Sequence, residues 1–113
     1  MVFNLIDDWG WANVGYHRDA SFNEIVTPNI DALVASGVEL DSYYVHKYCS
    51  PSRSSYQSGR LPMHVNVLND DMGIYNIHDP VSGFAGMARN FTGLATKLKT
   101  AGYATHMAGK WDA

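Results

Sequence analysis

The stretch Cys-Ser-Pro-Ser-Arg at residues 49–53 contains the only cysteine among 113 residues, so an internal disulfide is excluded. A helix is predicted here, because Ser50 is a good N-cap, Pro51 suits the first turn and Gly59 ends the run. Cys49 is expected just before the helix N-terminus, where backbone N–H groups and the helix dipole favour an anion. Arg53 adds a planar fork of donors for an oxyanion. On this pentapeptide alone, a small buried cysteine without chemistry remains an alternative.

The composition limits the classes of function. Hydrophobic residues make up 46%, charged residues 17%, and the net charge is −3, so no basic surface for nucleic acid is predicted. No apolar run approaches the roughly 18 residues that a membrane-spanning helix needs. The sequence shows no charged segment followed by an apolar one of the kind found in signal peptides. The length suits one small domain.

Hydrophobic periodicity and turn residues predict three helices and three strands. Thr27-Pro28 is typical of a helix start and Gly37 of its end, the second helix follows Cys49, and an apolar stripe from Phe91 to Leu98 predicts a third, ended by Gly102. Short apolar or alternating runs predict strands at 2–6, 38–44 and 103–107.

Two stretches without a clear period are predicted as loops. Residues 9–24 are rich in Gly, Asn, His and aromatic side chains. Residues 61–90 are polar, contain several glycines and prolines, and are predicted as a long excursion that serves a site or another part of the fold. The acidic pair Asp70-Asp71 within it is interpreted as solvated loop acids in preference to a second metal site.

Four blocks in order resemble the type I sulfatases, most nearly the arylsulfatase B-like branch. The resemblance covers essentially the whole chain and is weakest over 61–90. The blocks are Asp7-Asp8-Trp9-Gly10, Thr27-Pro28-Asn29-Ile30-Asp31, the Cys49 pentapeptide with Ser58-Gly59-Arg60, and Ala101-Gly102-Tyr103 through Gly109-Lys110-Trp111.

The resemblance implies an α/β fold of the alkaline phosphatase superfamily, a mixed sheet flanked by helices. Members of the family are several hundred residues long. Residues 1–113 are therefore expected to form a partial N-terminal sulfatase domain, in which the sheet is incomplete.

The resemblance also implies the site. Cys49 is expected to be oxidised to formylglycine by a formylglycine-generating enzyme, and its hydrate would attack the sulfate ester. Asp7 and Asp8, with the group derived from Cys49, would bind Ca²⁺ in preference to Mg²⁺. Arg53 and Lys110 would contact the sulfate and stabilise its charge. An acidic pair at a strand end without this resemblance is more often a polar cap.

Asp112 departs from the family pattern. Sulfatases usually place a histidine after Gly-Lys-Trp, where it assists proton transfer near the formylglycine. A carboxylate differs from that histidine in charge and in donor capacity. Asp112 is interpreted as a catalytic residue that could still act as acid or base if its surroundings shift its pKa.

The expected partners follow from the same resemblance: a sulfate ester and the maturation enzyme, with a partner chain that would complete the fold. The resemblance also implies the secretory pathway, the lysosome or the extracellular space, if a signal segment precedes Met1 in the natural protein. Which sulfate ester is bound stays open.

The residues bear on four other interpretations. A phosphatase of the same superfamily would use Ser or Thr without the Pro-Ser-Arg spacing. A cysteine phosphatase would need arginine at position 55, which is Ser55, and one cysteine with five scattered histidines makes a poor zinc site. The remaining rival is an inactive sulfatase remnant that acts as an interaction or structural piece.

Overall fold

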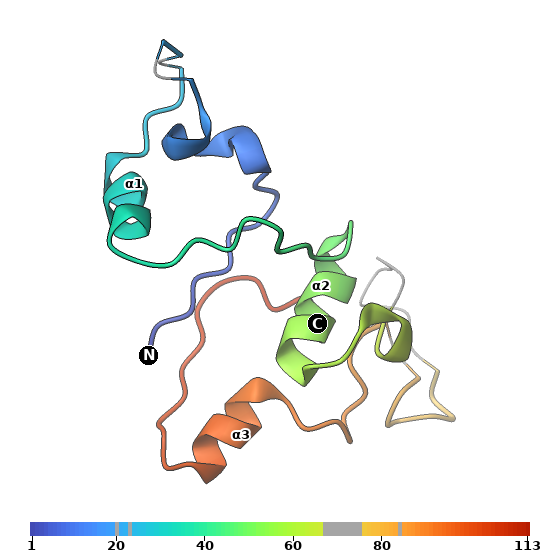
Figure 1. Ribbon diagram of the computed structural model, residues 1–113. Helices are drawn as coiled ribbons and strands as arrows, with labels where there is room; N and C mark the ends of the chain where they lie inside the picture. The colour runs from blue at the N-terminus through green and yellow to red at the C-terminus, as the bar shows by residue number, and fades with distance from the viewer. Residues whose placement is uncertain (20, 23, 67–75, 84) are drawn as a thin grey trace. The chain divides into compact units, whose positions relative to one another are not determined.

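The computed structural model describes residues 1–19, 21–22, 24–66, 76–83 and 85–113. These divide into two compact units, Met1–Tyr44 and Val45–Ala113. In the described residues the elements are the short 3-10 helices η1 (Trp11–Asn13), η2 (Gly15–His17) and η3 (Pro62–His64), and the α-helices α1 (Pro28–Ala35), α2 (Cys49–Ser58) and α3 (Leu94–Thr100) (Figure 1). The predicted Asp70-Asp71 pair lies outside the described residues.

In the first unit, α1 packs against η2. Helix α1 starts as predicted, with Thr27 at the N-cap and proline in the first turn. The Thr27 hydroxyl does not cap the helix: it accepts the backbone N–H of Gly15 at 2.8 Å and donates to Asp31 Oδ1 at 2.7 Å. A Cβ at Gly15 would lie 2.8 Å from Asp31 Oδ2, so glycine permits this close approach.

Residues 9–24 were predicted as loop, and this was incomplete because η1 and η2 lie there. His17 holds them in place by stacking on Trp11, with ring centroids 3.6 Å apart. Its Nδ1 lies 2.7 Å from the Trp11 carbonyl oxygen and its Nε2 lies 2.6 Å from Glu39 Oε1. Both neighbours are acceptors, so the doubly protonated imidazolium satisfies both contacts as a donor. Desolvation lowers the pKa of His17, but the Glu39 and Trp11 hydrogen bonds raise it, and the net shift is upward.

This raised pKa predicts a pH dependence of stability. The His17 contribution is fully present below the unfolded pKa of about 6.5 and is lost as pH rises through the folded pKa. Glu39→Gln is expected to lower the thermal midpoint more at about pH 5.5 than at about pH 8. Glu24→Gln, which neutralises an exposed acid of the same unit, serves as the control. A Glu39→Gln effect that is equal at both pH values would contradict the assignment.

In the second unit, α2 packs against α3 and η3. Helix α2 begins two residues earlier than predicted, with Tyr48 at the N-cap in place of Ser50, so Cys49 lies inside the first turn. The prediction that Ser50 caps the helix was wrong, because its hydroxyl donates to the Asp112 carboxylate instead. Gly59 ends α2 in the left-handed conformation, with φ 67°.

Helix α3 also ends as predicted. The Tyr103 N–H donates to the Leu98 carbonyl and the Gly102 N–H to the Lys99 carbonyl, with φ 87° at Gly102. This pair of bonds is a Schellman motif, which satisfies carbonyls at the helix end. The start was predicted too early: Phe91 precedes the helix, and its ring lies under the Arg60 guanidinium at 4.2 Å.

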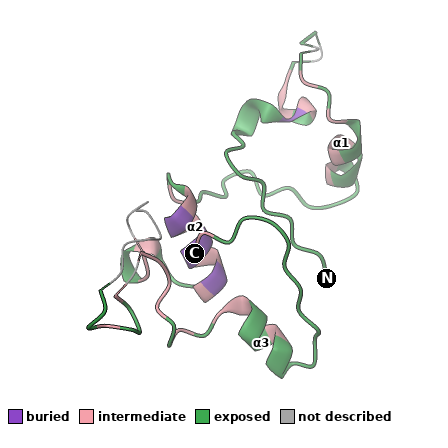
Figure 2. Cartoon of the chain, turned by 180° about the vertical axis from the view of Figure 1, so that it is seen from behind, coloured by how far each residue is buried: buried purple, intermediate pink, exposed green. Residues whose placement is uncertain are grey.

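Burial in the second unit is concentrated on α2, and the buried side chains are mostly polar (Figure 2). Ser50, Arg53 and Ser54 are 2%, 6% and 0% exposed, and Gln57 and Pro51 are buried beside them. Buried polar groups are costly unless they are hydrogen-bonded. Ser50 and Arg53 have partners on the segment around Lys110, whereas the Ser54 hydroxyl has none among the described residues.

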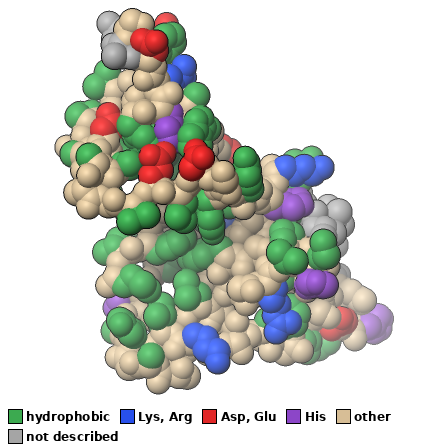
Figure 3. Space-filling view, viewed as in Figure 1, with side chains coloured by type: hydrophobic (Ala, Val, Ile, Leu, Met, Phe, Trp, Pro, Cys, Tyr) green, Lys and Arg blue, Asp and Glu red, His purple; other side chains and the backbone are tan. Residues whose placement is uncertain are grey.

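The predicted strands at 2–6, 38–44 and 103–107 do not form: these segments run as irregular chain in the described residues. A strand exists only through ladder bonds to a neighbour, and no described residue of these segments takes part in a ladder. Their apolar side chains are consequently exposed, with Val2 at 84%, Val38 at 88% and Tyr103 at 53%. Hydrophobic side chains are visible at many places on the face drawn in Figure 3. The α/β sheet itself remains a prediction.

The described part of the 61–90 excursion contains η3 and a turn around Asp79. Hydrogen bonds from the Ser82 hydroxyl and backbone N–H lower the pKa of Asp79. None of the described helices is long and apolar enough to cross a lipid bilayer.

Candidate active site

Helix α2 presents the two residues of the pentapeptide to which chemistry was assigned. Cys49 lies in its first turn and is half-buried, and Arg53 follows one turn later on the same helix. Residues four apart on a helix lie on the same face, so the thiol and the guanidinium stem are neighbours along α2. The helix dipole places partial positive charge at the turn that contains Cys49.

Arg53 connects α2 to the segment that contains Lys110. Its Nη1 donates a hydrogen bond of 2.7 Å to the Lys110 carbonyl oxygen, 57 residues further along the chain. Arg53 is almost fully buried whereas Lys110 is exposed, so this bond lies at the boundary of the buried region. The guanidinium therefore fixes the backbone of the Lys110 segment beside α2.

Asp112 forms a second connection between the same two segments. Its Oδ1 accepts a hydrogen bond of 2.9 Å from the Ser50 hydroxyl, and its Oδ2 lies 3.2 Å from Lys110 Nζ. Asp112 adopts a left-handed backbone conformation with φ 44°, which aspartate tolerates better than most residues. Both oxygens of this carboxylate face donors, one on α2 and one on its own segment.

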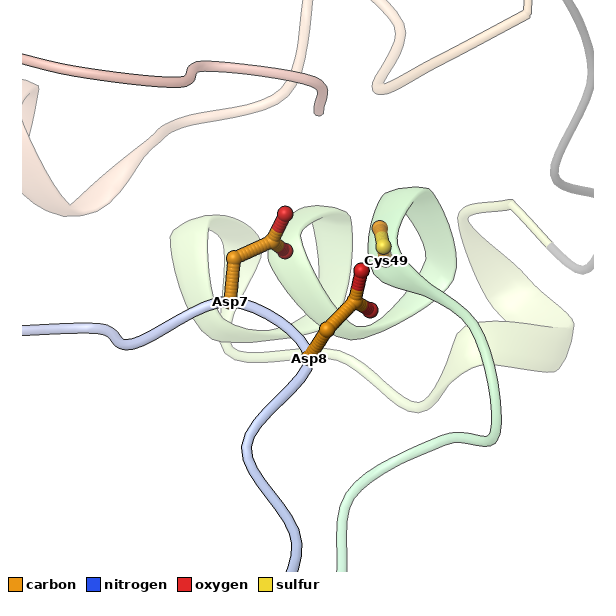
Figure 4. Close-up of side chains that lie close together, drawn as sticks. All are labelled: Asp7, Asp8 and Cys49. Atoms are coloured by element: carbon orange, nitrogen blue, oxygen red, sulfur yellow. The ribbon is translucent and has the colours of Figure 1, made fainter.

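Asp7 and Asp8 belong to the first unit, whereas Cys49 lies in the first turn of α2 in the second (Figure 4). One carboxylate oxygen of Asp7 and one of Asp8 lie within 4.8 Å of each other. Side chains of consecutive residues in an extended strand point to opposite faces. The left-handed φ of 51° at Asp8 breaks that alternation, which lets the two exposed carboxylates approach.

Comparison with known proteins gives the family. The sequence model of the sulfatase family, described as "Sulfatase", matches residues 1–113. The chain belongs to the sulfatase family. The family predicted from the four sequence blocks is thereby confirmed.

Curated relatives are themselves sulfatases. The chain is 40% identical over 111 residues to arylsulfatase J of Mus musculus, covering 98% of this chain and 17% of the relative. It is 33% identical over 112 residues to N-acetylgalactosamine-6-sulfatase of Rattus norvegicus, covering 98% of this chain and 21% of the relative. It is 36% identical over 112 residues to arylsulfatase G of Canis lupus familiaris, covering 98% and 19%. No solved structure matches.

The chain thus spans about a fifth of the length of these relatives. Within the second unit, the structure connects Arg53 with Lys110 and Lys110 with Asp112, through the contacts described above. The aspartates of the sulfatase pattern lie in the other unit.

Sequence reasoning missed the contact made by Ser50. Its hydroxyl was expected to cap α2, yet it bonds to a carboxylate 62 residues away. Local sequence signals describe capping and helix periodicity, and they contain no information about a partner at that separation. The buried hydroxyl of Ser54 was likewise not singled out.

Proposed function

We propose that this chain forms part of the active site of a sulfate ester hydrolase, in which Cys49 oxidised to formylglycine is the nucleophile. One observation carries this proposal: the Cys-x-Pro-x-Arg motif occupies the buried first turns of α2, with Arg53 bonded to the backbone of Lys110. Membership of the sulfatase family supports the reaction class. The relatives' names support sulfated substrates without selecting one.

The proposed chemistry begins with maturation. A formylglycine-generating enzyme catalyses a two-electron oxidation of the Cys49 side chain, with dioxygen as the terminal oxidant, which leaves an aldehyde and releases the sulfur as hydrogen sulfide. Water then adds to the aldehyde and gives a gem-diol. One diol oxygen attacks sulfur, the ester S–O bond breaks, and the leaving alcohol takes a proton. The second hydroxyl then loses its proton as the C=O bond re-forms, which expels hydrogen sulfate and restores the aldehyde. The net reaction consumes one water for each ester.

Arg53 and Lys110 would supply fixed positive charge for the sulfate oxygens. A planar guanidinium matches the geometry of two oxyanion oxygens, and an ammonium acts as a point charge. Arg53 is already held by its bond to the Lys110 carbonyl, so little reorganisation is needed when the ester binds. This preorganisation supports a role in stabilising charge during sulfuryl transfer.

The donors at Asp7 and Asp8 fit a hard cation, since Ca²⁺ and Mg²⁺ prefer carboxylate oxygen. A cysteine thiolate is a soft ligand that suits neither ion, whereas the hydrated aldehyde derived from Cys49 offers oxygen. We assign Asp7, Asp8 and the oxidised Cys49 side chain to calcium, with other ligands from elsewhere in the protein. Calcium would add positive charge near the reacting oxygens. This assignment is carried by the family resemblance and by donor chemistry.

Removal of calcium gives a direct prediction. Treatment of the natural protein with a calcium chelator is expected to lower sulfate ester hydrolysis by about tenfold or more, since the metal offsets charge in the transition state. Added Ca²⁺ should restore the rate better than equimolar Mg²⁺. Full activity after exhaustive chelation would contradict the metal assignment and leave the nucleophile assignment intact.

The reaction class is tested by assaying the natural protein that contains this chain. A chromogenic aryl sulfate and a sulfated carbohydrate should each be tried, with the matching aryl phosphate as control. We expect inorganic sulfate to be released faster than phosphate. Absence of sulfate release from protein that contains the aldehyde would contradict the proposal and favour the inactive interaction piece.

We also propose that residues 2–6, 38–44 and 103–107 become strands of an α/β mixed sheet in the complete sulfatase fold. Their exposed apolar side chains support this, because a central strand of such a sheet is apolar on both faces. Further chain or a partner chain would supply the neighbouring strands. Protection of these backbone amides from hydrogen exchange in the natural protein would agree with the proposal.

A further inference from the structure

Asp112 lies between two donors that come from different segments. Ser50, which is 2% exposed, donates its hydroxyl to Oδ1 of Asp112, and Lys110 Nζ lies 3.2 Å from Oδ2. The side chains of Lys110 and Asp112 are 43% and 20% exposed, so the ion pair lies at the edge of the buried region. The carboxylate therefore ties the ammonium group to the first turn of α2.

This arrangement gives Asp112 a different role from that of a proton donor. An ionised carboxylate accepts hydrogen bonds and has no proton to give. It also has the same sign of charge as a sulfate ester. Its ion pair with the Lys110 ammonium therefore weakens the attraction between that ammonium and the ester. Carboxylate and sulfate oxygens thus compete for one cation.

We propose that Asp112 is a positioning residue that, anchored by Ser50, fixes the Lys110 ammonium and weakens binding of the sulfate group. The inference rests on the proposed function, in which Lys110 contacts sulfate. It makes a prediction opposite to the usual effect of altering a site residue: removing the carboxylate charge tightens oxyanion binding. Binding that is too strong would slow release of the sulfate product, so a counter-charge at this position favours turnover.

The test compares two neutral replacements with one that keeps the charge. Asp112→Asn keeps an oxygen that can accept from Ser50, and Asp112→His introduces the residue usual in sulfatases. For each, the dissociation constant for inorganic sulfate, measured by calorimetry on the natural protein, is expected to fall roughly two- to fivefold. KM for a chromogenic aryl sulfate should fall in the same direction. Asp112→Glu, which keeps the negative charge, should change the dissociation constant for sulfate less than either neutral replacement does.

Two neutral variants keep the test decisive if one of them fails to fold. Unchanged or weaker sulfate binding in a folded Asp112→Asn or Asp112→His protein would overturn the inference, while hydrolysis by the natural protein would leave the proposed function standing. If the natural protein contains the aldehyde yet neither binds sulfate nor hydrolyses the ester, the proposed function fails and the inference fails with it. The two failures are therefore distinguishable.

Discussion

Replacing Cys49 with alanine is expected to lower kcat for sulfate ester hydrolysis by on the order of 10⁴- to 10⁶-fold, the usual cost of removing a catalytic nucleophile. Alanine has no sulfur, so the aldehyde cannot form and no gem-diol is available to attack the ester. The helix should persist, because alanine is the best helix former and Cys49 is only half-buried. The lower kcat would then result from the missing nucleophile and not from unfolding.

The matched control for this variant is Ser58→Ala on the same helix. The Ser58 hydroxyl donates to the Ser54 carbonyl at 2.7 Å within α2, and it has no role in the proposed reaction. We expect Ser58→Ala to retain activity. If Cys49→Ala hydrolysed the ester within tenfold of the natural rate, the nucleophile assignment would be wrong.

Replacing Arg53 with methionine is expected to lower kcat/KM by about 10²- to 10³-fold, the range for losing one preorganised charge-stabilising donor. The change also removes the charge-assisted hydrogen bond from the buried guanidinium to the Lys110 carbonyl, and this loss should cost about 1–3 kcal/mol of stability. Arg53→Lys should recover part of the activity through its charge, and less of the stability because lysine lacks the planar fork.

Arg53 also belongs to the motif that the maturation enzyme is expected to read. The aldehyde content of each variant must therefore be measured, and rates are compared per aldehyde. Arg60→Lys is the control, because Arg60 is exposed just beyond α2 and stacks on Phe91. An Arg53→Met protein with normal activity per aldehyde would remove Arg53 from the catalytic assignment.

The helices could be predicted from the sequence because their signals are local. Thr27-Pro28 marked the start of α1, Gly59 the end of α2 and Gly102 the end of α3, and each lies where the pattern placed it. The start of α3 was predicted too early because Phe91 fits the apolar stripe, although its ring packs against the Arg60 guanidinium before the helix begins. An apolar stripe cannot distinguish a helical position from a neighbouring loop residue that packs nearby.

The strands illustrate the opposite case. Val2 and Val38 belong to segments with strand composition, yet each is more than four-fifths exposed and unpaired in a ladder among the described residues. Strand propensity describes fit to a pleated, half-buried surface, so it has no effect until neighbouring strands are present. The sheet therefore depends on partners that a local pattern does not describe.

In the candidate site, too, local features could be predicted from the sequence and contacts between distant residues could not. Cys49 and Arg53 were recognisable from the motif, because their spacing on one helix is a local property. The bond from Arg53 to Lys110 and the bond from Ser50 to Asp112 join positions about 60 residues apart, and neither could be read from local pattern. The sequence showed that Asp112 stands where sulfatases usually have histidine. Only the structure showed its contacts with Ser50 and Lys110, on which its proposed role depends.

The most direct test of the central claim is mass spectrometry of the peptide that spans Cys49, prepared from the natural protein. We expect an aldehyde in place of the thiol in most molecules, with the mass of formylglycine or its hydrate. A peptide that contains only the unmodified thiol, in protein from cells that mature other sulfatases, would contradict it.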